Sequence, residues 1–253
     1  MNTALETTLN PILEKGNDDN KKVVNNKNKN RNSFNYYKNS YHEIVKVLYL
    51  SEFQYVNNIK ILIEKVKYPI QYSIKHKKPI LLQKDLDLIL KGIPDIFQLS
   101  WSLCKAFKHA LNTIEPNDFT SETVANIFLD HAKKFEVYIK YISYFSISSS
   151  AIKRLRSQRT IFRNFLNSLR KKKALGKFDD IQNILELPIE RIEKYINILR
   201  IVQKITMDQQ QYNEIIDEAL LFMEDLKDDL KRASDREKEL QNLYTIRNTI
   251  ENW

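Results

Sequence analysis

The sequence predicts an all-α protein, an elongated bundle of about six long helices. Only three glycines occur in 253 residues, at Gly16, Gly92 and Gly176. Tight hairpins and phosphate-binding loops depend on glycine for positive φ, so this composition disfavours β-rich folds and nucleotide-binding loops. Apolar residues recur three and four positions apart over long stretches, as in packed helices, and strand-type alternation is hard to find over any useful length.

Residues 1–40 have a different composition from the rest of the chain. They contain eleven asparagines and seven Lys or Arg, with few large apolar residues. Such a segment cannot bury enough apolar surface to offset the entropy lost on ordering. We therefore expect a disordered Asn/Lys-rich tail over 1–40 and a helical domain over 41–253.

The first expected helix starts at Tyr41. Its inward seam follows a 3-4-3-4 spacing. The seam consists of Val45, Leu48, Glu52, Tyr55, Ile59, Leu62 and Val66. Glu52 is its one charged member, and on pattern alone such a glutamate lies where a bundle opens to water. The helix is expected to end at Tyr68, because the residue before Pro69 is disfavoured in helical geometry.

The next helices are marked by their interruptions. A helix is expected over 84–112, bent or capped where Gly92 and Pro94 occur. Residues 115–118, EPND, have turn chemistry. Ser121 then resembles an N-cap for a helix that carries six apolar or aromatic inward residues. These are Val124, Ile127, Phe128, Phe135, Tyr138 and Tyr141.

A polar interruption at residues 148–150 separates that helix from a basic helix over 153–177. This stretch holds ten Lys or Arg and no acidic residue. Five apolar side chains are expected to face inward, and Gly176 is expected to close the helix. These five are Leu155, Phe162, Phe165, Leu166 and Leu169. Beyond Tyr212 a long C-terminal helix is expected to reach Leu240 and beyond. Its seam has the same 3-4 spacing and consists of Ile216, Ala219, Met223, Leu226, Leu230 and Ala233.

The stretch 185–202, LELPIERIEKYINILRIV, predicts a helix that is started or kinked by Pro188. Apolar residues cover more than half of its circumference, so the helix should lie deep in the bundle. One narrow charged strip remains, which must reach solvent or a partner. The strip consists of Glu190, Glu193, Lys194, Asn197, Arg200 and Lys204.

Composition also excludes several classes of protein. The single cysteine, Cys104, rules out an internal disulfide and suits a reducing compartment, and its apolar context favours a buried thiol. The four histidines are scattered, so no metal site is expected. No window is apolar enough to span a membrane. The chain therefore reads as cytoplasmic, and its net charge of +9 favours an acidic partner.

Two segments resemble the conserved blocks of Dbl-homology domains, which are guanine-nucleotide exchange factors for Rho-family GTPases. Residues 187–195, LPIERIEKY, with Ile198-Leu199, are similar to the third block, which usually reads K-P-V-Q-R-I-x-[KR]-Y-x-L-L-L. Residues 43–56, EIVKVLYLSEFQYV, resemble the first block, typically E-L-L-x-T-E-x-x-Y-V. Residues 127–141 match the weaker middle block, and the resemblance covers about residues 42–232.

The resemblance implies a Rho/Rac-type GTPase partner and nucleotide release without covalent chemistry or a cofactor. It places Glu52 at the first switch of the GTPase, and Lys194 at the second switch beside Glu190. Where the family has a GTPase-contacting asparagine on its last helix, this chain has Lys231, counted along the seam from Ala219. Leu187 replaces the usual lysine, and Glu190 replaces a glutamine.

Two alternatives remain open from the sequence. The chain can be a helical scaffold whose basic helix 153–177 docks anionic lipid or nucleic acid, of which nucleic acid is the less favoured. It can also be a degenerate Dbl-like scaffold that binds a GTPase without unloading it. A basic helix would further recruit an exchange factor to an anionic membrane.

Overall fold

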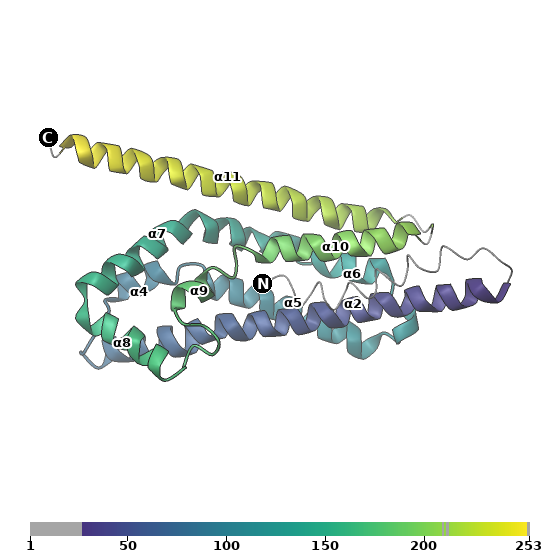
Figure 1. The fold of residues 1–253 in the computed structure, drawn as a ribbon, viewed down its shortest axis with the longest axis horizontal. Helices are drawn as coiled ribbons and strands as arrows, with labels where there is room; N and C mark the ends of the chain where they lie inside the picture. The colour runs from purple at the N-terminus through teal and green to yellow at the C-terminus, as the bar shows by residue number, and fades with distance from the viewer. Residues whose placement is uncertain (1–26, 209, 211–212, 252–253) are drawn as a thin grey trace.

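The computed structural model describes residues 27–251 apart from 209, 211 and 212, and every regular element among them is helical. The elements are α2 (Lys27–Ile61), η2 (Leu62–Lys67), α3 (Tyr68–Lys75), α4 (Gln83–Ile89), α5 (Ile93–Thr113), η3 (Pro116–Asp118), α6 (Ser121–Leu129), η4 (Ala132–Phe135), α7 (Glu136–Gln158), α8 (Thr160–Lys171), α9 (Ile181–Leu185), α10 (Arg191–Asp208) and α11 (Glu214–Glu251). They form an elongated bundle, as Figure 1 shows. The all-α prediction is confirmed.

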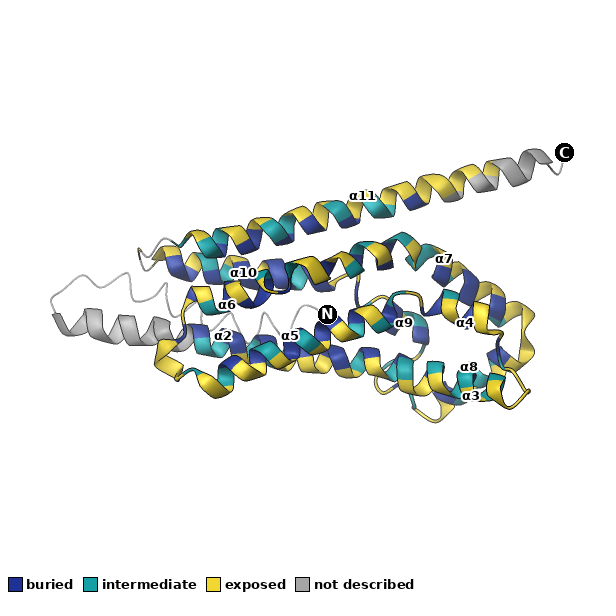
Figure 2. Ribbon diagram, turned by 180° about the vertical axis from the view of Figure 1, so that it is seen from behind, coloured by how far each residue is buried: buried dark blue, intermediate teal, exposed yellow. Residues whose placement is uncertain are grey.

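The long helices pack side by side along the bundle axis. α2 lies along α5, and α11 lies against α10, α6 and α7 (Figure 1). Figure 2 shows that the buried residues of each helix form a stripe turned towards its neighbours. This arrangement follows from the 3-4 spacing of apolar residues, because that spacing puts them on one helix face.

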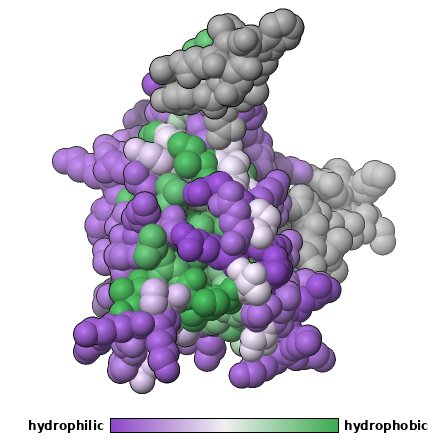
Figure 3. Space-filling model, turned by 90° about the vertical axis from the view of Figure 1, so that its left-hand side faces the viewer, coloured by the Kyte–Doolittle hydropathy of each residue, from purple (hydrophilic) through white to green (hydrophobic). Residues whose placement is uncertain are grey.

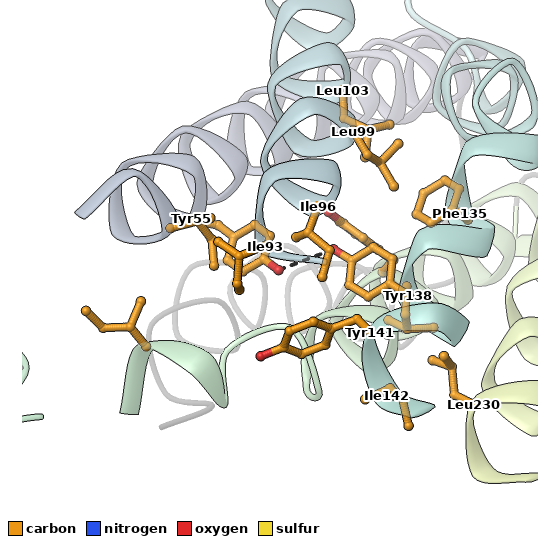
Figure 4. Close-up of a cluster of buried hydrophobic side chains, with 14 of the residues drawn as sticks. Tyr55, Ile93, Ile96, Leu99, Leu103, Phe135, Tyr138, Tyr141, Ile142 and Leu230 are labelled. Carbon is orange, nitrogen blue, oxygen red and sulfur yellow. Dashed lines mark hydrogen bonds between the residues drawn. The ribbon is translucent and has the colours of Figure 1, made fainter. Parts of the chain in front are cut away.

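The core is rich in aromatic side chains between α2, α5 and α7. Tyr55 and Tyr138 are buried there, and their hydroxyl groups are 3.3 Å apart in a hydrogen bond (Figure 4). Ile93 and Ile96 of α5 contribute to the same cluster (Figure 4). All seven residues of the predicted seam on the first helix are buried, including Glu52.

The first helix does not end at Tyr68, so that prediction is wrong. Tyr68 has helical dihedral angles, φ −63° and ψ −46°, and helical backbone continues through α3. Pro69 lacks an N–H and would clash with the carbonyl of Lys65 in a regular α-helix. The π-helical turn η2 precedes it, in which the Tyr68 N–H donates to Ile63 O. The wider turn accommodates the proline without a break.

The helix boundaries at Gly92 and residue 120 are set by backbone geometry. Gly92 has φ +80° and separates α4 from α5, as its position predicted. A side chain there would also be tight, because a Cβ atom would lie 3.2 Å from Tyr141 Cδ2. The N-cap of α6 is Thr120 rather than Ser121: Thr120 and Thr123 form a reciprocal capping box, and Ser121 is the first helical residue.

Residues 148–150 do not interrupt a helix, which corrects a second boundary. α7 runs through them, and Ser148 Oγ donates to Leu88 O at 2.8 Å in α4. That tertiary hydrogen bond satisfies the buried hydroxyl, so the local preference of serine for a break does not decide the structure. The basic stretch 153–177 is consequently not one helix. It spans the end of α7, a break at Arg159, the helix α8 and the turns that follow.

The N-terminal boundary also differs from the expectation. α2 begins at Lys27, so residues 27–40 of the expected tail are helical, while residues 1–26 lie outside the described residues. Extending a helix costs far less than nucleating one. The packed part of α2 therefore provides a nucleus onto which these asparagine-rich residues can add turns.

Candidate functional site

The two segments that resemble conserved blocks meet in the interior of the bundle. Glu52 of α2 has a fully buried side chain, and the Arg191 guanidinium donates Nη2–H to its Oε2. The Tyr195 hydroxyl donates to the same oxygen at 2.6 Å, and Arg191 Nη1 donates to Ser51 Oγ at 2.9 Å. A single carboxylate oxygen thus joins α2 to the first turn of α10. Isolated buried charges are costly, and here each charge is compensated by the other.

Arg191 lies between two aromatic rings. Its guanidinium carbon is 4.7 Å from the centroid of Tyr55 and 4.8 Å from that of Tyr195, both within cation–π range. Burial by itself lowers the pKa of the Arg191 guanidinium, but the charge of Glu52 and the hydrogen bonds outweigh it and raise the pKa. Arg191 therefore stays charged, and the pair with Glu52 is a permanent feature of the folded protein.

The tyrosines around this pair are held in the neutral form. Burial raises the pKa of Tyr138 to about 12, and the charge of Glu52 adds to the shift. Burial also raises the pKa of Tyr195 well above its usual value; the Arg191 charge opposes this shift and Glu52 adds to it. Burial and the charge of Glu52 raise the pKa of Cys104 to about 11. The thiol is buried, as the sequence predicted.

Pro188 sets where α10 begins. It is buried in a turn over 186–190, and the Arg191 N–H donates to Pro188 O at 3.2 Å. The helix therefore starts three residues after the proline. Its first residue is Arg191, whose side chain enters the core, and Glu190 directly before it remains on the surface. The position of Pro188 thus fixes which charge is buried.

The charged strip of α10 lies on the outside, as predicted. The Lys194 side chain is 27% exposed, and its Nζ lies 3.4 Å from Oε2 of Glu190, whose side chain is 67% exposed. Other members of the strip contact α11: Arg200 pairs with Glu224 at 2.8 Å, and Glu193 pairs with Lys227. These pairs set the register of α10 against α11 and leave Glu190 and Lys194 facing away from the bundle.

Lys231 is exposed on α11, one turn after Lys227. Because Lys227 pairs with Glu193, Lys231 belongs to the part of α11 that passes the start of α10. The seam that flanks it is buried through Met223, Leu226 and Leu230, in agreement with the predicted register. The structure thus puts Glu190, Lys194 and Lys231 on the surface and Glu52 beneath it.

The burial of Glu52 corrects the interpretation that a seam glutamate opens to water. Its side chain has no exposed area, and among the described residues no donor lies within hydrogen-bond distance of its second oxygen, Oε1. Sequence reasoning missed the partner, Arg191. The signal was present, because Arg191 precedes Tyr195, Ile198 and Val202 at helical spacing and so occupies an apolar seam. Each of the two seams contains one charge, and the two charges have opposite signs, which is what a buried pair between the helices requires.

Exposed apolar residues close in sequence to Glu52 and Glu190 were also missed. Leu50 and Phe53 flank Ser51 and Glu52 on α2 and are 55% and 43% exposed, and Ile189 beside Glu190 is 41% exposed. Large apolar side chains on a surface with charged neighbours are typical of a protein-binding face. They lie off the buried seam, so helical periodicity alone gave no reason to select them.

The described part of the chain shows no group of three or more His, Cys, Asp or Glu side chains arranged to hold a metal ion. In the same residues, no helix is long and apolar enough to cross a membrane. The site combines the buried Glu52–Arg191 pair with charged and apolar side chains that are exposed on α2 and around the start of α10.

Family comparison assigns this arrangement to a known class. The RhoGEF domain model matches residues 44–231, which is most of the chain. That range includes the α2 segment with Glu52, the whole of α10, and α11 as far as Lys231. The chain belongs to the RhoGEF domain family.

Individual relatives agree with the family assignment. Protein ECT2 of Mus musculus is 24% identical over 205 residues, covering 78% of this chain and 22% of the relative. Rac guanine nucleotide exchange factor JJ of Dictyostelium discoideum is 22% identical over 198 residues, covering 78% of this chain and 16% of the relative. The chain thus spans about a fifth of the length of these curated relatives.

Solved structures show the same fold at low identity. A structure of the Vav1 exchange factor matches with a TM-score of 0.68 and 20% identity, over 84% of this chain and 54% of that one. The complex of PDZ-RhoGEF DH/PH domains with GTP-gamma-S activated RhoA matches with a TM-score of 0.67 and 15% identity, over 81% and 56%. The elongated helical bundle is therefore a Dbl-homology fold.

Proposed function

We propose that this protein is a guanine-nucleotide exchange factor that binds a Rho/Rac-type small GTPase and accelerates GDP release. The observation that carries the proposal is the convergence of α2 and α10 at the Glu52–Arg191 pair within a RhoGEF domain. The relatives named as Rac exchange factors and the neighbour solved with RhoA support the choice of partner.

The exchange reaction needs no covalent step at this protein. A GTPase holds its switches against the nucleotide and Mg²⁺, and a factor that binds the empty form better accelerates release. In the proposed complex, Leu50, Phe53 and Ile189 supply apolar contact, while Glu190 and Lys194 supply charged contact with the second switch. Lys231 extends this charged surface onto α11.

Glu52 has a different position from these surface residues. The resemblance implies a contact between Glu52 and the first switch, yet the Glu52 carboxylate is held by Arg191 and Tyr195 in the free protein. We propose that its first contribution is to fix the spacing of α2 and α10, so that both switches meet one rigid surface. Its unpaired Oε1 is the acceptor that a switch donor would take if binding widened the space between the two helices.

Nucleotide release tests the proposal directly. Rho- and Rac-type GTPases loaded with a fluorescent guanine nucleotide are mixed with the protein and excess unlabelled nucleotide, and the decay rate is followed. We expect catalysed release from at least one GTPase, at protein concentrations below that of the GTPase. Binding to the empty GTPase without faster release would instead identify the degenerate scaffold, which the departures at Leu187, Glu190 and Lys231 would then explain.

The same proposal includes a place of action in the cytoplasm with recruitment to an anionic membrane. The basic stretch 153–177 supports recruitment, because ten Lys or Arg without an acid attract anionic lipid headgroups. Nucleic acid would attract the same charges, so charge alone does not identify the partner. The surroundings of these residues in the fold are more specific.

A further inference from the structure

The end of the bundle that carries α4 and α8 brings together two basic segments distant in sequence. Residues 75–84, which include the α3–α4 loop and the helix ends beside it, contain four lysines and no acid, and the stretch 153–177 contains ten Lys or Arg and no acid. The two meet at a groove of about 310 Å³ between residues 79–82 and residues 158–161. Two separate parts of the chain thus put the same charge on one end face.

The basic side chains on this face are available to a partner. Among the described residues, Arg156 is the one member of the stretch 153–177 with an ion pair, at 2.6 Å from Asp180. Lys77, Lys78, Lys84 and Arg159 are exposed. A folded surface normally intersperses both signs of charge, so two adjoining segments that contain no acidic residue give this end a positive potential. Nearby acids include Asp180, which pairs with Arg156, and the exposed Asp87 of α4.

Exposed apolar side chains lie within this basic face. Ile161 at the start of α8 is 63% exposed, and Leu82 at the start of α4 is 44% exposed; both line the groove. Figure 3 views this end of the molecule and shows apolar side chains gathered in the middle and lower part of the face, bordered by hydrophilic ones. Apolar tips surrounded by basic residues are the chemistry of a surface that inserts into a bilayer interface.

Hydrogen bonds hold the backbone on both sides of the groove. The Ile80 N–H donates to Ser73 Oγ at 3.0 Å, and that hydroxyl donates to Ile70 O at 2.7 Å, which fixes the α3–α4 loop. On the opposite wall, the Arg163 guanidinium donates to Thr160 Oγ1 at 3.2 Å across the first turn of α8. Leu82 and Ile161 are therefore presented together, without an ordering step on binding.

We propose that this end face, which we call the α4–α8 face and define by Lys77, Lys78, Leu82, Lys84, Arg159 and Ile161, docks on an anionic lipid bilayer. Leu82 and Ile161 enter the headgroup–acyl boundary, and the basic residues contact lipid phosphates and carboxylates. Lipid fits better than nucleic acid because single-stranded nucleic acid is bound by aromatic stacking, whereas the exposed apolar residues that line the groove, Leu82 and Ile161, are aliphatic. The face uses none of the residues assigned to GTPase binding.

Vesicle co-sedimentation tests the proposal with the full chain and without any GTPase. Phosphatidylcholine vesicles are compared with vesicles that also contain phosphatidylserine. The wild type binds only the anionic vesicles, and binding weakens as salt rises. Because nucleotide release is not measured, this result is independent of the exchange activity. Absence of binding to anionic vesicles at low salt would overturn the proposal.

Two pairs of variants separate the face from general charge and apolarity. Ile161→Ser lowers the partition coefficient about tenfold, whereas Leu221→Ser, which replaces a residue 60% exposed on α11, leaves it unchanged. Removing one basic charge near an anionic surface lowers the partition coefficient about fivefold. Arg159→Glu also adds a negative charge, so it lowers the coefficient more than fivefold. Lys133→Glu, at an exposed lysine of η4, lowers the partition coefficient less than Arg159→Glu does.

The outcomes below would contradict docking of this face on a bilayer. All four residues are exposed, so melting curves should match the wild type and exclude unfolding as a cause. Equal losses in Arg159→Glu and Lys133→Glu with none in Ile161→Ser would show diffuse charge attraction rather than a docking face. Displacement from vesicles by a DNA duplex, with Ile161→Ser binding that duplex as well as wild type, would identify nucleic acid as the occupant.

Discussion

The α2–α10 centre and the α4–α8 face use charge in opposite ways. At the centre one carboxylate and one guanidinium are buried together, and each determines the position of the other. At the end, basic residues are exposed and Arg156 is the one with a carboxylate partner along the described stretch 153–177. A buried pair is short-ranged and insensitive to salt, so it fixes helix geometry. An exposed unpaired cluster acts over about a Debye length, roughly 8–10 Å at physiological salt, and attracts a partner.

The largest expected effect is at the centre. Glu52→Ala should lower the free energy of unfolding by about 3–5 kcal/mol, because the Arg191 guanidinium would be left buried without its counter-charge. Arg191→Ala should lower the free energy of unfolding by a similar amount, because the Glu52 carboxylate would be left buried without its counter-charge. Urea denaturation followed by circular dichroism measures both losses. A loss below about 1 kcal/mol, the range of exposed ion pairs, would remove the distinction between the two regions.

The double variant Glu52→Leu with Arg191→Met sharpens this test. If the two residues act through one another, the double variant should be less destabilised than the sum of the single changes, since no unpaired charge remains. Additive losses would mean that the two side chains stabilise the fold independently.

The next effect is alkaline destabilisation of the centre. The pKa of Tyr138 is about 12 in the fold and 10 in the unfolded chain, so its neutral form is favoured by folding. This stabilisation is fully present below pH 10 and is lost as pH rises towards about 12, by up to about 3 kcal/mol. Tyr138→Phe should reduce this alkaline slope. An unchanged slope would place the pH dependence elsewhere.

The smallest effect is expected at the basic end. Lys172→Glu should change the free energy of unfolding by no more than about 0.5 kcal/mol, since the residue is exposed and its basic neighbours repel it. The substitution should slightly raise the free energy of unfolding at low salt, and this gain should disappear at high salt because the repulsion is screened. Denaturation at two ionic strengths measures this. A loss comparable to that of Glu52→Ala would show that the basic end is part of the structural core.

Sequence reasoning succeeded where local pattern and tertiary packing agree. The seams of α2, α10 and α11 were correct because 3-4 spacing of apolar residues leaves one possible inward face. It failed at Pro69 and at residues 148–150, where a π turn and the Ser148–Leu88 hydrogen bond override local preferences. The Glu52–Arg191 pair joins residues 139 positions apart, and a single sequence shows two seam charges without showing that they meet.

The site itself was predicted in part. Glu190, Lys194 and Lys231 are on the surface, as the helical register indicated. The exposed apolar residues Leu50, Phe53 and Ile189 were missed, because periodicity selects residues that face inward. The four residues chosen from the sequence remain predictions as GTPase contacts.

The central claim is that the outer face of α10 contacts a GTPase, while the buried Glu52–Arg191 pair beneath it fixes the spacing of α2 and α10. The direct test compares Lys194→Glu with Lys133→Glu in one fluorescent-nucleotide release assay, alongside their melting temperatures. Both variants change an exposed or half-exposed lysine to an acid, so both should melt as the wild type does. We predict that Lys194→Glu lowers the nucleotide release rate at least about tenfold, since charge reversal at an interface costs several kcal/mol. Lys133→Glu should keep the wild-type rate. Equal release rates for the two variants would contradict the account.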